Sequence, residues 1–241
     1  MIIDGKHIYI YGEKEIRSTL VIVNTFQGNG SEIYSALKSM TEKYFCLAVV
    51  SDIDWNDEMS PWECPPLYKK DDPCTGGADK YLDKLIKDIV PAIKDNLVRA
   101  PEKVIIAGYS LAGLFAVYSL YKTDVFSGAV SASGSMWFPG FMEFTYTNNF
   151  IKEPEKVYFS LGDKEAKTRN QILSTVENRT SQIYEKYKNM GIDTVFEINP
   201  GNHFKDADIR MAKGITWILD EPWRASVIRG MEADKYGEKK Q

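Results

Sequence analysis

The sequence has 241 residues, 44% of them hydrophobic and 27% charged, with a formal net charge of −4. Because the balance is acidic and the lysines are dispersed, the composition argues against a nucleic-acid-binding protein. No apolar run reaches the roughly 18 residues of a membrane span, and the first residues lack the basic and apolar regions of a secretory signal, so we expect a soluble cytoplasmic protein.

Apolar runs alternate with helical spacings along the first half of the chain. The strands expected here are 7–11, 19–24 and 45–50. A turn at Gly12 should follow the first strand, and Ser31 is expected to cap a helix that continues to Met40. Apolar residues at helical spacing predict a helix over 79–98, which Pro91 bends or restarts. The segment 51–78 has no such pattern and is expected to be irregular.

The second half continues this alternation, with a second irregular and aromatic-rich segment at 135–155. The expected elements are strands over 104–107, 128–133, 157–161 and 194–198, and helices over 111–121, 170–190 and 206–219. Strands that alternate with helices predict an α/β fold, with a mainly parallel sheet flanked by helices. No linker marks a boundary, so we expect one domain over 1–241 whose last part, 221–241, is a frayed tail.

Ser110 carries the most informative motif of the chain. It lies in the string Gly108-Tyr109-Ser110-Leu111-Ala112, between an apolar strand-like run and a helical stretch. This is the context of a nucleophile elbow, in which small residues on either side of the serine permit a tight turn. The elbow raises the serine hydroxyl at the carboxyl end of the sheet, which predicts that Ser110 is a nucleophile.

A nucleophilic serine needs a base, and the base needs an acid that orients it. His203 is the better candidate of two histidines because it follows a predicted strand at the carboxyl edge of the sheet, whereas His7 lies in the first strand and is expected to be structural or exposed. Asp163 and Glu165 both follow another strand. We favour Glu165, which lies farther from the strand end, and keep Asp163 as the alternative. The order serine, acid, histidine is that of α/β-hydrolases.

The same edge of the sheet should supply the groups that bind a substrate. An oxyanion needs two backbone N–H donors; Leu111 is expected to provide one, and Phe26 or Thr25 the other. The two long irregular segments should lie over Ser110 and form the pocket. The aromatic residues expected to line it are Trp55, Trp62, Trp137 and Phe138.

The three cysteines are expected to have no catalytic role. Cys46 lies in an apolar run and should be a buried thiol. Cys64 and Cys74 share one loop, where they could pair in an oxidising compartment but should be reduced in the cytoplasm. Their spacing does not suit a metal site and only His7 and His203 could add imidazole ligands, so we expect no metal.

With these residues in view, the chain resembles the putative esterase family of α/β-hydrolases, which includes feruloyl and acetyl-xylan esterases, S-formylglutathione hydrolases, siderophore esterases and mycolyl transferases. The resemblance spans about 19–219 and rests on the elbow 108–113, the strand end 161–165 and the turn Asn202-His203-Phe204. The acid of this family commonly lies three positions after the glycine of that strand end, which implies Glu165, although the family more often uses aspartate.

These observations together predict a serine hydrolase that cleaves a small-molecule carboxylic ester through an acyl-enzyme intermediate, without cofactor or metal. Two alternatives remain open. An acyltransferase would use the same residues with an alcohol in place of water, and a non-catalytic binding protein could use the same fold.

Overall fold

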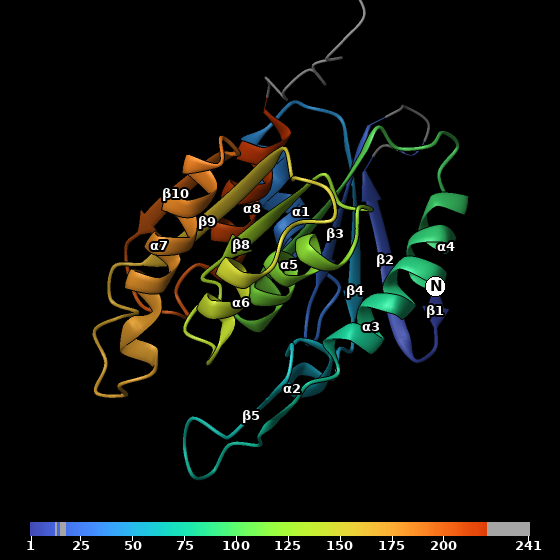
Figure 1. Cartoon of the computed structure of the whole chain (residues 1–241). Helices are drawn as coiled ribbons and strands as arrows, with labels where there is room; N and C mark the ends of the chain where they lie inside the picture. Colours follow the sequence, from blue (N-terminus) through green and yellow to red (C-terminus); the bar gives the residue numbers. More distant parts are fainter. Residues whose placement is uncertain (13, 15–17, 221–241) are drawn as a thin grey trace, which may run out of the picture.

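The computed structural model describes residues 1–12, 14 and 18–220, so the expected tail at 221–241 lies outside the described residues. The described part is built on an eight-stranded sheet with the order β1-β2-β4-β3-β7-β8-β9-β10 (Figure 1). The strands are β1 (Ile2–Ile3), β2 (Lys6–Gly12), β3 (Thr19–Asn24), β4 (Phe45–Ser51), β7 (Lys103–Tyr109), β8 (Gly128–Ala132), β9 (Lys156–Gly162) and β10 (Asp193–Asn199).

The six strands from β4 to β10 run parallel, and β1 and β2 add an antiparallel edge. The parallel strands are nearly continuous apolar runs because helices cover both faces of the sheet. Their carboxyl ends are in register: Asn24 of β3 lies beside Gly108 of β7, and Gly162 of β9 beside Asn199 of β10. The segments that follow these strands therefore emerge at one edge of the sheet.

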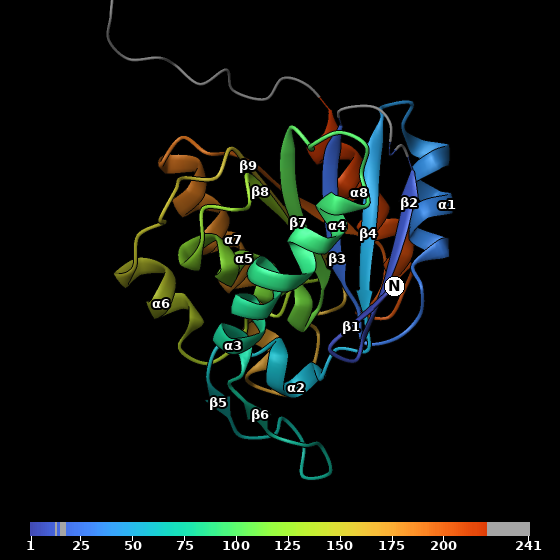
Figure 2. The same ribbon diagram turned by 90° about the vertical axis from the view of Figure 1, so that its right-hand side faces the viewer.

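Two layers of helices enclose the sheet (Figures 1 and 2). The helices of these layers include α1 (Ser31–Met40), α3 (Ala78–Lys84), α4 (Val90–Asp95), α5 (Leu111–Lys122), α7 (Val176–Asn189) and α8 (Ala207–Leu219). Side chains of α3, α4, α5 and α7 pack in one apolar cluster against one face, and those of α1 and α8 pack against the other. The mixed α/β fold with a mainly parallel sheet is as the sequence predicted.

One local prediction for a helix was confirmed in its main feature and another was wrong. The helix expected over 79–98 is present and ends at Asp95, and α4 begins at Val90 with Pro91 in its first turn, as the expected restart requires; a π-helical turn, Leu85–Ile89, joins it to α3. Pro91 has no N–H and its ring would clash with the carbonyl four residues earlier, so a wider turn before it accommodates the ring. Ser31 is the first residue of α1 and not its cap; Gly30, with φ of 76°, precedes the helix, and Asn29 Oδ1 accepts from the Ser31 amide.

The two segments expected to be irregular contain short elements that their sequences do not reveal. These are α2 (Trp55–Glu58), β5 (Glu63–Cys64), β6 (Cys74–Thr75) and α6 (Phe141–Thr147). Strands β5 and β6 pair with each other and form a hairpin that projects from the body below the carboxyl end of β4 (Figure 2). Elements of two to seven residues are too short to show a hydrophobic period.

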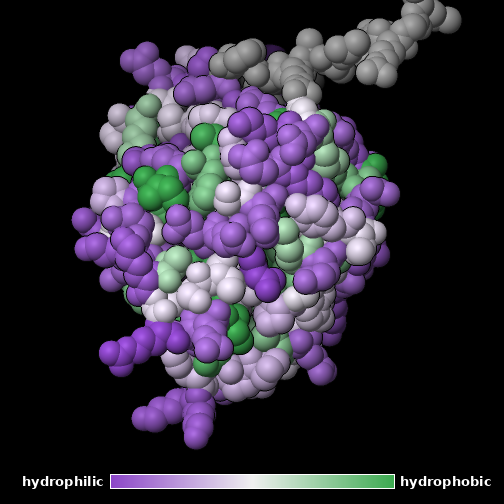
Figure 3. Space-filling model, turned by 60° about the vertical axis from the view of Figure 1, so that its left-hand side comes forward, coloured by the Kyte–Doolittle hydropathy of each residue, from purple (hydrophilic) through white to green (hydrophobic). Residues whose placement is uncertain are grey.

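The surface in Figure 3 is mostly hydrophilic, and apolar side chains appear on that face as small separate patches. Within the described ranges, no helix combines the length and apolar character needed to cross a membrane.

Candidate active site

Ser110 occupies a strained turn between β7 and α5. Its φ of 57° and ψ of −122° are a conformation that residues other than glycine rarely adopt. The turn is so tight that a Cβ added to Gly108 would lie 2.2 Å from the backbone of Ala112. The small residues on either side are therefore a steric requirement of the turn, and the turn leaves the hydroxyl of Ser110 accessible at the carboxyl edge of the sheet.

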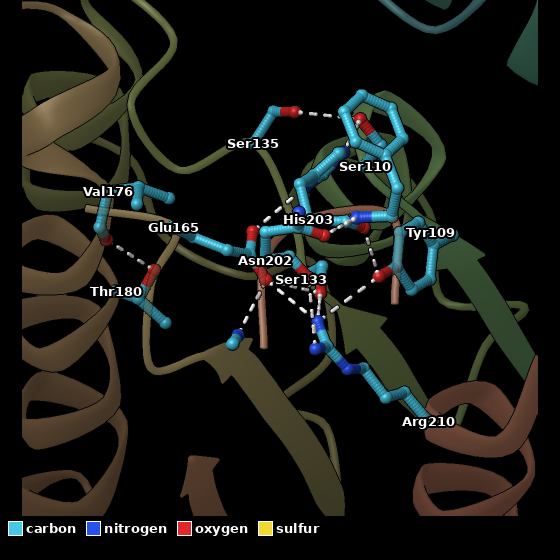
Figure 4. A network of polar contacts seen from close by, with 12 residues as sticks. Tyr109, Ser110, Ser133, Ser135, Glu165, Val176, Thr180, Asn202, His203 and Arg210 are labelled. Carbon is cyan, nitrogen blue, oxygen red and sulfur yellow. Dashed lines mark hydrogen bonds and ion pairs between the residues drawn. The ribbon is translucent and has the colours of Figure 1, made fainter. Parts of the chain in front are cut away.

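A chain of hydrogen bonds runs from Ser110 through His203 to Glu165 (Figure 4). The Ser110 Oγ lies 3.1 Å from His203 Nε2, and His203 Nδ1 lies 2.8 Å from Glu165 Oε2. The Glu165 side chain is 4% exposed and that of His203 is 30% exposed. Asp163 is exposed, and its Oδ1 accepts from the Gly201 amide at 2.6 Å. The structure thus brings Glu165 to His203 and places Asp163 in the adjoining turn.

The environment of Glu165 favours its ionised form. Burial alone raises the pKa of this carboxyl, but hydrogen bonds from His203 and from the Gly162 amide outweigh it and hold the pKa below the usual value. The second oxygen, Oε1, accepts from the Gly162 amide at 2.5 Å, from Ser133 Oγ at 2.8 Å and from Arg210 Nη1 at 2.9 Å. A carboxylate can only accept, so His203 Nδ1 must carry the proton and Nε2 is left to accept from Ser110.

The structure adds residues that the sequence analysis missed. Ser133, after β8, and Arg210, on α8, both donate to Glu165, and Tyr109 Oη donates to the His203 carbonyl at 2.7 Å. The Ser135 hydroxyl lies 3.4 Å from the Ser110 hydroxyl. The one signal in the sequence is the helical spacing of Arg210 with Gly214 and Ile218, which places an arginine on the apolar face of α8.

The expected oxyanion donors divide into two groups. The Thr25 amide donates to the Val50 carbonyl at 2.9 Å, so it extends the sheet and is not available; this expectation was wrong. Among the described residues, the amides of Leu111 and Phe26 have no acceptor. Leu111 directly follows Ser110, and Phe26 follows the end of β3, which pairs with β7. Both amides therefore belong to adjacent turns at the same edge.

A cavity of about 330 Å³ opens beside Ser110 and His203. Apart from Ser110, Ser133, Glu165 and His203, its walls are apolar or aromatic: Leu67, Tyr68, Trp137, Leu173, Val176 and Phe204. Leu67 and Tyr68 lie at the tip of the β5–β6 hairpin, and Trp137 is the one expected aromatic wall that this cavity contains.

The other three expected aromatic walls lie elsewhere. Trp55 packs edge-on against Phe26 and lines a separate, open depression of about 720 Å³ with acidic residues. Trp62 donates from Nε1 to the Pro139 carbonyl at 2.9 Å and packs among core aromatic rings. Phe138 is fully buried. Trp62 and Phe138 therefore hold their loops onto the core and do not line the cavity.

His7 and the cysteines lie away from this cavity. His7 Nδ1 pairs with Asp52 Oδ2 at 2.7 Å, and both side chains are half exposed. Cys46 is buried, while Cys64 and Cys74 face each other across the β5–β6 pair as free thiols.

Residues 25–206 match the model of the family described as "Putative esterase". The chain belongs to this family. The matched range contains Ser110, Glu165 and His203, and the match supports ester hydrolysis as the class of reaction. A curated relative, the uncharacterized protein YbbA of Bacillus subtilis, is 25% identical to this chain over 138 residues. That alignment covers 56% of this chain and 55% of the relative, about half of each protein.

Solved structures with this fold include a serine hydrolase, a siderophore hydrolase and an esterase. An IroE-like serine hydrolase from Shewanella oneidensis has a TM-score of 0.72 at 17% identity, covering 89% of this chain and 75% of that one. The siderophore hydrolase EstA of Aspergillus nidulans has a TM-score of 0.68 at 14% identity, covering 89% of each chain. The enterobactin esterase FES of Shigella flexneri has a TM-score of 0.61 at 13% identity, covering 88% of this chain and 55% of that one. At these identities the likeness shows the α/β-hydrolase fold alone.

Proposed function

We propose that this putative esterase family member is a serine esterase that hydrolyses a small-molecule carboxylic ester through an acyl-enzyme on Ser110. The observation that carries the proposal is the hydrogen-bonded chain from Ser110 through His203 to Glu165, with Ser110 held in the strained turn that exposes its hydroxyl. Nucleophile, base and orienting acid are within hydrogen-bond reach in the order that acyl transfer needs.

The reaction then follows from the positions of the groups. Ser110 Oγ attacks the acyl carbon while His203 Nε2 takes its proton, and the ionised Glu165 stabilises the imidazolium that forms. The amides of Leu111 and Phe26 donate to the oxyanion of the tetrahedral intermediate. His203 returns the proton to the alcohol as its bond to the acyl carbon breaks. Water then attacks the acyl carbon while His203 takes a proton from it, and His203 gives that proton to Ser110 Oγ as the carboxylic acid leaves.

The cavity suggests the kind of ester that fits. Its walls beyond the reacting residues carry no charge, so an uncharged apolar or aromatic substituent would bury its surface there without leaving an unpaired charge. Siderophore hydrolases share the fold, so a siderophore ester belongs in the substrate panel beside simple aryl esters.

The test is covalent labelling of the purified protein with a fluorophosphonate, followed by mapping of the labelled peptide. We expect the label on Ser110, and we expect Ser110→Ala to lose labelling and to lower kcat by about 10⁶-fold. Ser119→Ala is a matched control, because Ser119 is buried in α5, the helix that follows Ser110, and its hydroxyl donates to the Ala116 carbonyl. Labelling elsewhere, or more than about 1% residual activity in Ser110→Ala, would contradict the proposal. Products formed with added alcohols distinguish hydrolysis from acyl transfer.

A further inference from the structure

Arg210 is a fully buried cation beside the proposed catalytic residues. It lies on the apolar face of α8 and is 1% exposed. Nη1 donates to Glu165 Oε1 at 2.9 Å, Ser133 Oγ at 3.0 Å and Tyr109 Oη at 3.3 Å, and Nη2 donates to the carbonyls of Asn202 at 3.0 Å and Pro200 at 3.2 Å. Figure 4 shows the guanidinium pointing into this network from below the site.

We infer that Arg210 is a positioning residue that fixes the Glu165–His203 pair and whose buried charge balances that of Glu165. This inference rests on the serine esterase proposed above. It extends that proposal, because it gives Arg210, which touches no substrate, a role in the geometry and in the charge of the site.

The geometric part follows from the contacts at the two guanidinium nitrogens. Nη1 and the Gly162 amide hold Glu165 Oε1 from different directions, so the other oxygen of the carboxylate must face His203. Nη2 binds the carbonyls on either side of Gly201, in the turn that carries His203. One side chain thus fixes the acid and the histidine turn relative to each other. A lysine has a single nitrogen and cannot make both sets of contacts.

The close approach of Arg210 to the strand end depends on a missing side chain. A Cβ added to Gly162, the last residue of β9, would lie 2.9 and 3.0 Å from the two guanidinium nitrogens and 2.3 Å from the Gly201 carbonyl oxygen. Glycine at this position therefore admits the guanidinium between the ends of β9 and β10, where it reaches Glu165.

The electrostatic part follows from burial. The side chains of Arg210 and Glu165 are 1% and 4% exposed, so solvent and salt screen their charges little. The cation balances the carboxylate and limits how strongly that carboxylate favours imidazolium over neutral imidazole. The titratable or charged groups around the network are Tyr109 from β7, Asp163 and Glu165 after β9, His203 and Lys205 after β10, and Asp206 and Lys213 at α8. Asp163, Lys205 and Asp206 are exposed and therefore screened.

The experiment compares the wild type with Arg210→Gln, which removes the charge, and Arg210→Lys, which keeps the charge but lacks the second guanidinium nitrogen. Lys156→Met is the matched control: Lys156 is a buried cation that also binds two carbonyls, those of Trp217 and Asp220, but it lies at the opposite end of β9. Fluorophosphonate titration counts competent sites, so that kcat is expressed per folded active enzyme. The pH profile of kcat/KM is recorded for each protein.

We expect Arg210→Gln to move the midpoint of the acidic limb of kcat/KM upward by roughly one pH unit, because the uncompensated carboxylate then favours protonated His203. Arg210→Lys should keep the midpoint near that of the wild type and lower kcat by about tenfold to a hundredfold. Lys156→Met should change neither the midpoint nor kcat per site.

An unchanged midpoint in Arg210→Gln would overturn the electrostatic part, and an unchanged kcat in Arg210→Lys would overturn the geometric part. If Arg210→Gln does not fold, Arg210→Lys still decides whether the guanidinium positions Glu165 and His203. An unchanged kcat in Arg210→Lys refutes the inference. Failure of the proposed function itself is a separate result: the wild type would neither label nor hydrolyse any ester.

Discussion

Substitution of the two candidate acids by their amides tests which carboxylate orients His203. In Glu165→Gln, the oxygen of the new amide and its NH2 group must share the two positions that Oε1 and Oε2 now occupy. Three donors converge on the Oε1 position, from Gly162, Ser133 and Arg210. The amide oxygen will therefore take that position, because the NH2 group would face donors there.

This orientation turns the amide NH2 group toward His203 Nδ1. The ring then accepts at Nδ1 and carries its proton on Nε2, which faces Ser110 and can no longer take the serine proton. The corresponding aspartate-to-asparagine change in a serine protease lowers kcat by about 10⁴-fold. We expect the same order here, and a factor of 10⁴ corresponds to about 5.4 kcal/mol in the activation free energy. Loss of the carboxylate also leaves the buried charge of Arg210 without an anionic partner, which should destabilise the fold by about 3 kcal/mol.

Asp163→Asn is the matched control. Asp163 is exposed, and the amide oxygen of asparagine can still accept from the Gly201 amide. We expect kcat within about threefold of the wild type and a change in unfolding free energy of about 0.5 kcal/mol or less. The assay is kcat for an aryl ester, normalised by fluorophosphonate titration, with thermal unfolding of each variant measured in parallel. A large loss in Asp163→Asn together with a mild loss in Glu165→Gln would refute the reasoning.

Two further predictions concern the aromatic segments and the thiols. Trp137→Ala should change the relative kcat/KM across an ester panel, because Trp137 lines the cavity. Trp62→Ala should leave this preference unchanged and destabilise the fold by about 3 kcal/mol. The opposite pattern would contradict the assignment of Trp137 to the cavity wall. Burial raises the pKa of Cys46 and of Cys74 to about 11. Both thiols of the native protein should therefore be alkylated slowly at pH 8, at rates that rise toward pH 11. Protein that is denatured and alkylated at lysis should show three free thiols. A count of one thiol would indicate a bond between Cys74 and Cys64.

The sequence predicted the sheet and the main helices well because their signals are periodic. The strand at 19–24 and the elbow at Ser110 needed only an apolar run and small residues beside the serine. The segment around Pro91 shows where such reasoning ends: the proline indicates a disturbance of the helix, but the disturbance takes the form of a π-turn before it, which depends on how the helix packs.

The walls of the cavity were harder to predict than the hydrogen-bonded chain from Ser110 to Glu165, for a physical reason. Strand and helix periods tell which side chains share a face, whereas a loop has no period. Trp137 and Phe138 are neighbours, yet one lines the cavity and the other is in the core. Arg210 was predictable in principle, because an arginine on the apolar face of a helix needs a buried partner, but only the fold shows that the partner is Glu165.

In the proposed mechanism, the β5–β6 hairpin separates substrate choice from chemistry. Its tip, with Leu67 and Tyr68, forms part of the cavity wall, while Ser110, Glu165 and His203 all follow strands of the main sheet. The contact of the tip with the rest of the protein includes one bond from Asn170 Nδ2 to the Leu67 carbonyl at 3.3 Å.

Because doubling the length of a flexible loop costs only about 0.6 kcal/mol in closure entropy, this hairpin can be lengthened, shortened or exchanged with little effect on folding. Natural variation and protein engineering can therefore retune which esters enter the cavity by replacing the residues between Cys64 and Cys74, with the reacting groups left in place.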